Sequence, residues 1–198
     1  MIRQRRNRKE EVLQTAAAHF AQHGFHGATL SAIADVVGLT EPGLLHYFPS
    51  KAALLQGVLD YRDEKDKEKY LTILDQNKGA LFDALSDLVV SNQERLGLVQ
   101  LFTVMVGESI NTDHPSHDFF VTRYRNTKAL LKGYLQQIQD ENSDPLSNAE
   151  LEKLSALILA VMDGLQIQWL LEPNSIDMSA CFELFLRILQ DNMKQTDG

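Results

Sequence analysis

Five cations follow one another near the start of the chain with no acid between them: Arg3, Arg5, Arg6, Arg8 and Lys9. Residues 1–51 carry six Lys/Arg and four Asp/Glu, although the whole chain has a net charge of −8. Guanidinium and ammonium groups bind phosphate oxygens through charge-assisted hydrogen bonds. The uneven charge therefore indicates a polyanion-binding head on an acidic body, and a solvated basic tail is the alternative interpretation.

A second stretch whose residues could take part in binding is LTEPGLLHYFPSK, residues 39–51. It predicts a short helix, because Thr40 is a favourable N-cap, Pro42 is tolerated in a first turn and Pro49 ends the helix. Four positions of this helix are predicted to point outward: Thr40, Glu41, Gly43 and His46. A helix of this kind fits the major groove of DNA, about 12 Å wide, with its side chains at the base edges.

Gly38 is predicted to be the turn of a helix-turn-helix, since glycine accepts a positive φ without a Cβ penalty. Ala34 is small at the point where the second helix must cross the first. Apolar residues around the turn are expected to form the shared core: Ile33, Val37, Leu39, Leu44 and Tyr47.

Helical periodicity dominates the chain, and no β-alternation of useful length occurs. The predicted fold class is all-α, with about nine helices. The first helix carries Val12 to Phe20 and stops at Gly24, the second runs from a Thr29 cap to Gly38, and the third lies between Thr40 and Pro49. The other six are expected at about 51–74, 79–96, 97–110, 115–139, 147–173 and 177–195.

Composition limits the function classes. The sequence contains no run of about 18 apolar residues, so no membrane span and no membrane partner is expected. The single cysteine, Cys181, excludes an intramolecular disulfide; it is predicted to be a buried, inert thiol, with a redox sensor as the alternative. No nucleophile signature, phosphate loop or dinucleotide-binding glycine pattern occurs, so neither an enzyme activity nor a cofactor is predicted.

His114 and His117 lie between Asp113 and Asp118, and all four are residue types that bind zinc. The segment also precedes a helix, where Asp, His and Ser act as caps and Pro115 opens the first turn. Capping is the favoured interpretation, and no metal site is predicted.

The order of these signals strongly resembles the N-terminal domain of the TetR family of bacterial transcriptional regulators. The resemblance covers residues 8–58 and includes Gly24-Phe25, Thr29, Ile33-Ala34, Val37-Gly38-Leu39 and Tyr47-Phe48-Pro49-Ser50-Lys51-x-x-Leu54-Leu55. It implies a homodimeric, ligand-responsive DNA-binding protein of the bacterial cytoplasm and nucleoid, usually a repressor. Residues 1–50 would be the DNA-binding domain with its basic arm, and residues 51–198 the regulatory and dimerisation domain.

Roles follow from the resemblance for individual positions. Thr29 and Lys51 would hold phosphates of the operator, which is double-stranded DNA. Thr40, Glu41, Pro42, Gly43, His46 and Tyr47 would form the face toward DNA. An arm before the first helix, with Arg3, Arg5, Arg6 and Arg8, would follow the phosphates or enter the minor groove. The chain departs from the family at Leu45, where a phosphate-contacting tyrosine is common.

Residues 151–171 and 181–189 are apolar around most of the helix circumference, which requires burial on more than one side. We expect these two helices to form the interface of a two-fold homodimer; a monomer with a very apolar core is the alternative. The candidate contacts are Leu157, Val161, Leu165, Phe182, Phe185 and Leu189.

The central helices carry residues that could line a pocket for a small, largely apolar effector: Phe102, Met105, Glu108, Phe119, Arg123, Tyr124, Gln166 and Trp169. For any one of them, ordinary core packing is the alternative. If the helical corner serves only for packing, the chain would be a helical ligand-carrier or interaction protein without specific DNA binding.

Overall fold

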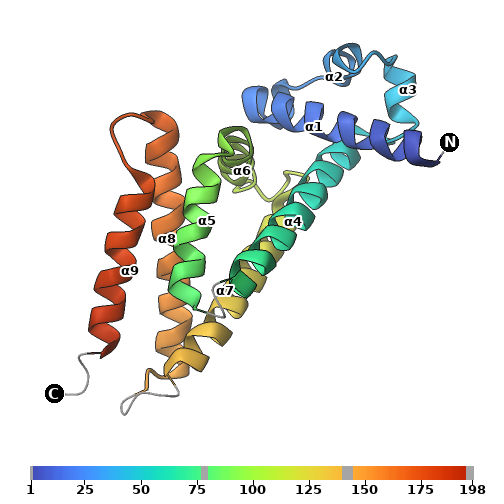
Figure 1. The fold of residues 1–198 in the computed structure, drawn as a ribbon. Helices are drawn as coiled ribbons and strands as arrows, with labels where there is room; N and C mark the ends of the chain where they lie inside the picture. Colours follow the sequence, from blue (N-terminus) through green and yellow to red (C-terminus); the bar gives the residue numbers. More distant parts are fainter. Residues whose placement is uncertain (1, 77–79, 140–144, 195–198) are drawn as a thin grey trace. The chain divides into compact units, whose positions relative to one another are not determined.

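The computed structural model describes residues 2–76, 80–139 and 145–194, apart from the side chains of residues 2–7, 66, 68–71, 73–76 and 194. Nine helices and no strand occur in these ranges, which confirms the predicted all-α class (Figure 1). The helices are α1 (Ile2–Gly27), α2 (Leu30–Val36), α3 (Glu41–Leu45), α4 (Lys51–Gln76), α5 (Leu81–Gln93), α6 (Leu96–Glu108), α7 (His117–Gln139), α8 (Asn148–Leu171) and α9 (Met178–Lys194).

The helices pack as two compact units. The first comprises Met1–Lys69 and Arg95–Phe120, and the second comprises Tyr70–Glu94 and Val121–Gly198. The long helix α4 passes from the first unit into the second. Because α6 packs along α1, a segment predicted for the regulatory domain shares a core with the helix-turn-helix. The functional boundary at residue 50 stays a prediction.

Helix α1 differs from its prediction at its start. Its backbone is helical from Ile2, so the predicted arm before the first helix is wrong: the cations belong to the helix itself. At the other end, where one further helical turn follows, Gly24 interrupts the helix as predicted. It has a non-helical φ of 68° and bends the helix, which continues for one more turn to Gly27. The amide of Ala28 closes this turn on the Gly24 carbonyl at 3.2 Å.

The other helix starts mostly follow their predicted caps. The Thr29 and Thr40 hydroxyls accept hydrogen bonds from Ala32 N and Gly43 N, each at 3.2 Å. Ser147 and Glu150 form the predicted capping box at the start of α8. Helix α5 is shorter than expected, and α7 begins at His117 instead of Pro115. The segment before α7 is a turn closed by the His117 amide on the His114 carbonyl at 3.0 Å.

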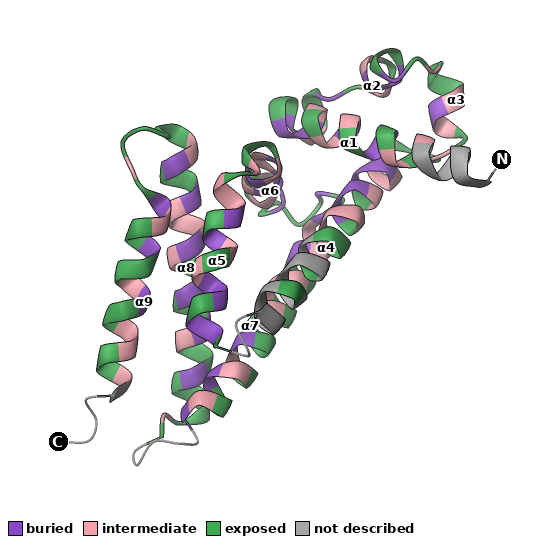
Figure 2. Ribbon diagram, in the orientation of Figure 1, coloured by how far each residue is buried: buried purple, intermediate pink, exposed green. Residues whose placement is uncertain are grey.

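The core of the first unit lies where α1, α4 and α6 meet. Buried side chains recur at helical spacing on each: Val12, Ala16 and Phe20 on α1, Leu54, Leu55 and Val58 on α4, and Leu101 and Met105 on α6. Burying one such Leu or Phe stabilises the fold by about 1.5–3 kcal/mol relative to leaving it exposed. This core supports α2 and α3, which lie between α1 and α4 in the sequence. Buried residues are purple in Figure 2.

In the second unit, α9 packs against α5 and α8, and one stripe of each helix is buried (Figure 2). On α9 the buried stripe contains Met178, Phe182 and Leu186 at four-residue spacing. Cys181 lies one residue away from that stripe and is exposed, so the prediction of a buried thiol is wrong. Helix α8 is also apolar and long enough to cross a membrane by length and composition alone, contrary to expectation, but core helices of soluble proteins meet the same criterion.

Candidate nucleic-acid interface

The helix-turn-helix consists of α2, a short turn and α3. Gly38 has the predicted positive φ, 64°, and the Leu39 amide donates to the Ala34 carbonyl at 2.9 Å. Ile33, Ala34, Val37 and Leu44 are buried in the corner, as expected from the sequence. Local geometry and packing therefore agree in fixing the direction in which α3 leaves the turn.

The outer face of α3 carries the side chains that the sequence placed there. Thr40, Glu41, Pro42 and His46 are exposed, and Gly43 and Tyr47 are half-buried. The rings of His46 and Tyr47 meet edge to face with centroids 6.1 Å apart. Leu45, the position at which the chain departs from the family pattern, is half-buried. The structure thus presents a short polar and aromatic surface on a rigid corner.

Arg8 already has partners within the protein. Its Nη2 donates to the Val37 carbonyl at 2.5 Å, and its Nη1 pairs with Glu11 at 2.8 Å. Arg8 therefore joins α1 to the turn before α3, which the sequence did not indicate. The side chains of Arg3, Arg5 and Arg6 lie outside the described residues, so their predicted DNA contacts stay predictions.

Lys51 has a second role besides the predicted phosphate contact. Its Nζ donates to the Ala28 carbonyl at 2.9 Å, approaches the His26 carbonyl at 3.4 Å and lies 4.7 Å from the centre of the Phe25 ring. It thus ties the first residue of α4 to the end of α1. Thr29, the other predicted phosphate contact, is exposed beside this segment and caps α2.

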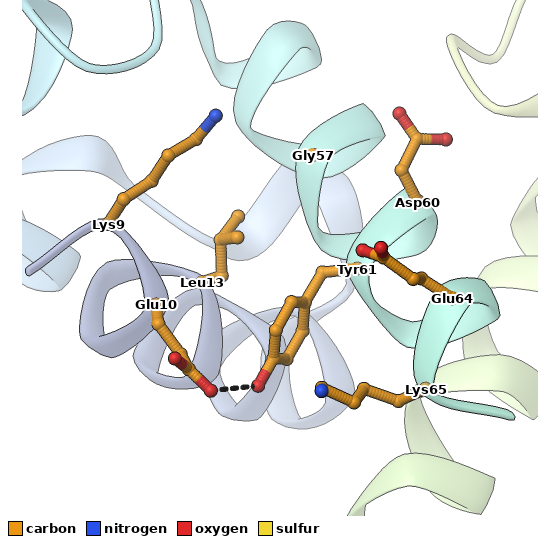
Figure 3. Close-up of a pocket in the computed structure, with 8 residues that line it drawn as sticks. All are labelled: Lys9, Glu10, Leu13, Gly57, Asp60, Tyr61, Glu64 and Lys65. Atoms are coloured by element: carbon orange, nitrogen blue, oxygen red, sulfur yellow. Dashed lines mark hydrogen bonds between the residues drawn. The ribbon is translucent and has the colours of Figure 1, made fainter. Parts of the chain in front are cut away.

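A hollow of about 470 Å³ lies between α1 and α4 in the first unit (Figure 3). The Tyr61 side chain points from α4 toward α1 and donates to Glu10 Oε1 at 2.5 Å, and this hydrogen bond raises the pKa of Tyr61. The lining mixes both charge signs: Lys9, Glu10, Leu13, Gly57, Asp60, Tyr61, Glu64 and Lys65. Its charged character does not match a largely apolar effector, and none of the predicted pocket residues lines it.

The eight predicted pocket residues are divided between the two units. Phe102, Met105, Glu108 and Phe119 belong to the first unit, and Arg123, Tyr124, Gln166 and Trp169 belong to the second. Several have packing or bonding roles: Phe102, Met105, Gln166 and Trp169 are buried, and Tyr124 donates to Asp163 Oδ2 at 2.6 Å. The effector pocket stays a prediction.

The predicted dimer contacts differ in accessibility. Leu157 is exposed, whereas Val161, Leu165, Phe185 and Leu189 are half-buried. Phe182 is 0% exposed and packs within its own protomer, so it is a poor candidate for contact with a partner. The apolar side chains that remain exposed on these helices include four that the sequence analysis did not select: Ile167, Leu171, Leu184 and Ile188.

His114 does not cap α7. It is buried, and its Nδ1 accepts from the Ser116 amide at 3.3 Å and lies 2.8 Å from Ser116 Oγ and 3.1 Å from Ser109 Oγ. In the described parts of the chain, no three His, Cys, Asp or Glu residues come together as a metal site. The capping interpretation is wrong for His114, because its ring closes the turn from inside.

Two side chains of α6 contact the bend of α1, and sequence reasoning missed both contacts. Glu108 accepts a hydrogen bond from the Phe25 amide at 2.7 Å, and Gln100 donates to the Ala21 carbonyl at 3.3 Å. The partners are 83 and 79 residues apart in the sequence. In the sequence, the Gly24-Phe25 pair was the local signal that the backbone of α1 departs from a regular helix at this point.

The fold and this geometry define a helix-turn-helix protein with a helical body. A family model described as bacterial regulatory proteins, tetR family, matches residues 12–58. A solved structure of similar fold, a putative transcriptional regulator from Pseudomonas aeruginosa, superposes with a TM-score of 0.78 and 18% identity and covers 95% of this chain and 90% of that one. Residues 12–58 therefore carry a helix-turn-helix domain of the tetR family, and the whole chain shares its fold with the solved regulator.

Two curated relatives agree with this assignment. The nucleoid occlusion factor SlmA of Idiomarina loihiensis is 30% identical over 117 residues, which are 58% of this chain and 58% of that protein. The HTH-type transcriptional regulator RutR of Escherichia coli is 46% identical over 52 residues, which are 26% of this chain and 24% of that protein. These alignments cover less than two thirds of either relative.

Proposed function

We propose that this protein is a DNA-binding transcriptional regulator, a repressor that binds a near-palindromic operator as a homodimer and is released by a small molecule. The observation that carries the proposal is the outer face of α3, held by a buried corner with Gly38 at φ 64°. This face presents an exposed His46 beside a half-buried Tyr47. Both are suited to base edges and phosphates in a major groove.

Roles at the DNA are assigned to side chains in and around the helix-turn-helix. Thr40, Glu41, Pro42, Gly43, His46 and Tyr47 face the groove, and Glu41 accepts from cytosine N4 if it reaches a base. Thr29 and Lys51 lie beside the backbone phosphates. Arg3, Arg5, Arg6 and Arg8, whose backbone belongs to α1, are proposed to contact backbone phosphates. The net charge of −8 then belongs mainly to the rest of the chain, where it disfavours non-specific attachment to DNA.

The dimer is supported by apolar side chains that the protomer leaves exposed on α8 and α9. Leu171 is 81% exposed, and Leu157 lies fourteen residues earlier on the same face. On α9, Cys181, Leu184 and Ile188 form a second stripe at helical spacing. A two-fold axis between such helices would place the two α3 helices about 34 Å apart, on successive turns of one DNA face.

The effector is proposed to be a small, largely apolar molecule. The proposed role is regulatory, and no catalytic role is proposed for any residue. Its site of action is the bacterial nucleoid in the cytoplasm, because its partner is chromosomal DNA.

The test is selection from a random-sequence DNA library, followed by fluorescence anisotropy on the enriched duplex over a salt series. Each phosphate neutralised adds about −0.9 to the slope of log K against log salt. His46→Ala on α3 should weaken specific binding, whereas His23→Ala, an exposed histidine on α1, is the matched control and should not. Failure to enrich any sequence would favour a helical ligand-carrier or interaction protein.

A second candidate function is that of a nucleoid occlusion factor. The observation that favours it is the similarity to SlmA proteins beyond the head: the SlmA of Shewanella woodyi is 26% identical over 166 residues, 80% of this chain. Mapping of chromosomal sites separates the two candidates. One or a few sites beside regulated genes support a repressor, whereas many dispersed sites support the occlusion factor.

A further inference from the structure

The bend of α1 at Gly24 lies directly under the carboxylate of Glu108. A Cβ on Gly24 would lie 2.0 Å from Glu108 Oε1, which is far inside any allowed contact. Gly24 also has a φ of 68°, which other residues adopt only with strain. The positive φ therefore favours glycine here, and a Cβ at this position would also require the Glu108 carboxylate to move.

Two residues of α6 provide partners for backbone groups on both sides of the bend. In an uninterrupted α-helix the Phe25 amide would donate to the Ala21 carbonyl. Here the Phe25 amide donates to Glu108 Oε2 at 2.7 Å, and the Ala21 carbonyl accepts from Gln100 Nε2 at 3.3 Å. Buried amide and carbonyl groups without partners are costly, so these two bonds make the bend favourable.

The segment after the bend, residues 25–28, leads directly into α2 through Thr29. Lys51 at the start of α4 holds this segment through the Ala28 carbonyl at 2.9 Å and the Phe25 ring. The position of α2, and with it α3, thus depends on a short backbone segment whose amide is bonded to α6 and whose carbonyl is bonded to α4.

His114 lies beside Glu108. The Nδ1 atom of His114 accepts from the Ser116 amide, so the neutral ring carries its proton on Nε2, which lies 3.4 Å from Glu108 Oε2. The ring also packs edge to face on Phe25, with centroids 5.2 Å apart. The charged or titratable groups that face His114 are Glu108 on α6 and His26 at the end of α1, whose ring centroid is 6.1 Å away.

We propose that Glu108 and Gln100 are positioning residues for DNA binding: through the Phe25 amide and the Ala21 carbonyl, they set the bend of α1 and hence the placement of α2 and α3. This inference rests on the proposed function, because placement of α3 matters only if α3 binds DNA. This role differs from ordinary core packing, because the hydrogen bonds join side chains of α6 to the backbone segment that leads into α2 and α3.

The experiment compares Glu108→Ala with Glu108→Gln. Both variants remove one negative charge, but only glutamine keeps an oxygen that accepts from the Phe25 amide. Glu108→Ala should weaken binding to the selected operator about tenfold or more and change binding to an unrelated duplex by less than about twofold. Glu108→Gln should recover most of the operator affinity. Circular dichroism and melting establish that each variant is folded.

Gly24→Ala gives an independent test of the contact. It should weaken operator binding in the wild-type background and much less in the Glu108→Ala background, because the carboxylate that the new Cβ meets is gone. Strain from the positive φ remains in both backgrounds, so the double-variant cycle isolates the contact with Glu108.

Hydrogen exchange provides a measurement without DNA. Glu108→Ala should speed exchange of the Phe25 amide about tenfold or more, and Glu108→Gln should not. The inference is overturned if Glu108→Ala binds operator like the wild type, if it weakens both DNAs equally, or if the Phe25 exchange rate is unchanged. A wild-type protein that enriches no DNA sequence would overturn the proposed function instead, and the exchange result would still report on the bend.

Discussion

The helix-turn-helix and the pair α8–α9 reach definite structures by different physical means. In and just before the first, side chains bond to backbone groups at defined points: Arg8 to the Val37 carbonyl, Lys51 to the Ala28 carbonyl and Glu108 to the Phe25 amide. In the second, apolar stripes pack along helices, and part of the apolar surface stays exposed. Directional bonds fix a position, whereas apolar stripes leave the choice of partner open.

The largest expected effect tests whether α8 and α9 need a partner subunit. Leu171→Lys places a charge on a position that is 81% exposed in the protomer and proposed to be buried in the dimer. Sedimentation should show a monomer, with operator affinity reduced about 100-fold or more because two heads no longer bind together. Ile110→Lys is the matched control in the first unit, since Ile110 is 80% exposed. A dimeric Leu171→Lys protein would remove this face from the interface.

Gly38→Val tests the fixed geometry of the head. The nearest atom to a Cβ at Gly38 is Arg8 Nη2 at 3.9 Å, so space is available and only the φ of 64° opposes the change. A β-branched residue should lower the free energy of unfolding by about 2 kcal/mol or more, measured by urea titration. Gly38→Asn is the control, because asparagine tolerates this conformation better. Equal stability of the two variants would show that the strain is relieved elsewhere.

Lys51→Ala separates a structural role of the Lys51 side chain from a role in binding a DNA phosphate. Loss of the bond to Ala28 and of the contact with the Phe25 ring should destabilise the first unit by about 1–2 kcal/mol. If Lys51 also binds a phosphate, the salt slope of operator binding should flatten by about one unit. Thermal melting measures the first effect and anisotropy over a salt series the second. An unchanged slope would leave Lys51 with the structural role alone.

The smallest expected effect concerns His114. Burial lowers the pKa of His114 below its ordinary value of 6.5, and the nearby Glu108 carboxylate opposes this shift. The unfolded chain therefore binds the proton first, and stability falls as the pH drops below about 6.5. Urea unfolding at pH 7.5 and 5.5 should show a smaller acid loss for His114→Gln than for the wild type. His23→Gln, at an exposed position, is the control, and an identical acid loss in His114→Gln would contradict the assignment.

Sequence alone predicted features that depend on neighbouring residues. The Thr29 and Thr40 caps, the positive φ of Gly38 and the Ser147–Glu150 capping box follow from residue types within a few positions of one another. The contact between Glu108 and Phe25 could not be predicted, because it joins residues 83 apart and depends on how α6 lies against α1. The exposure of Cys181 was missed for a related reason: both faces of α9 are apolar, and the sequence does not show which one the protomer buries.

The exposed thiol of Cys181 allows the second unit to be labelled at one defined position. It is the only cysteine in the chain, so a maleimide dye or spin label attaches once per protomer without any engineered substitution. The thiol lies on the stripe of α9 proposed to meet a partner subunit. Its labelling rate should therefore fall with rising protein concentration, and this dependence would report the dissociation constant of the dimer directly from the unmodified sequence.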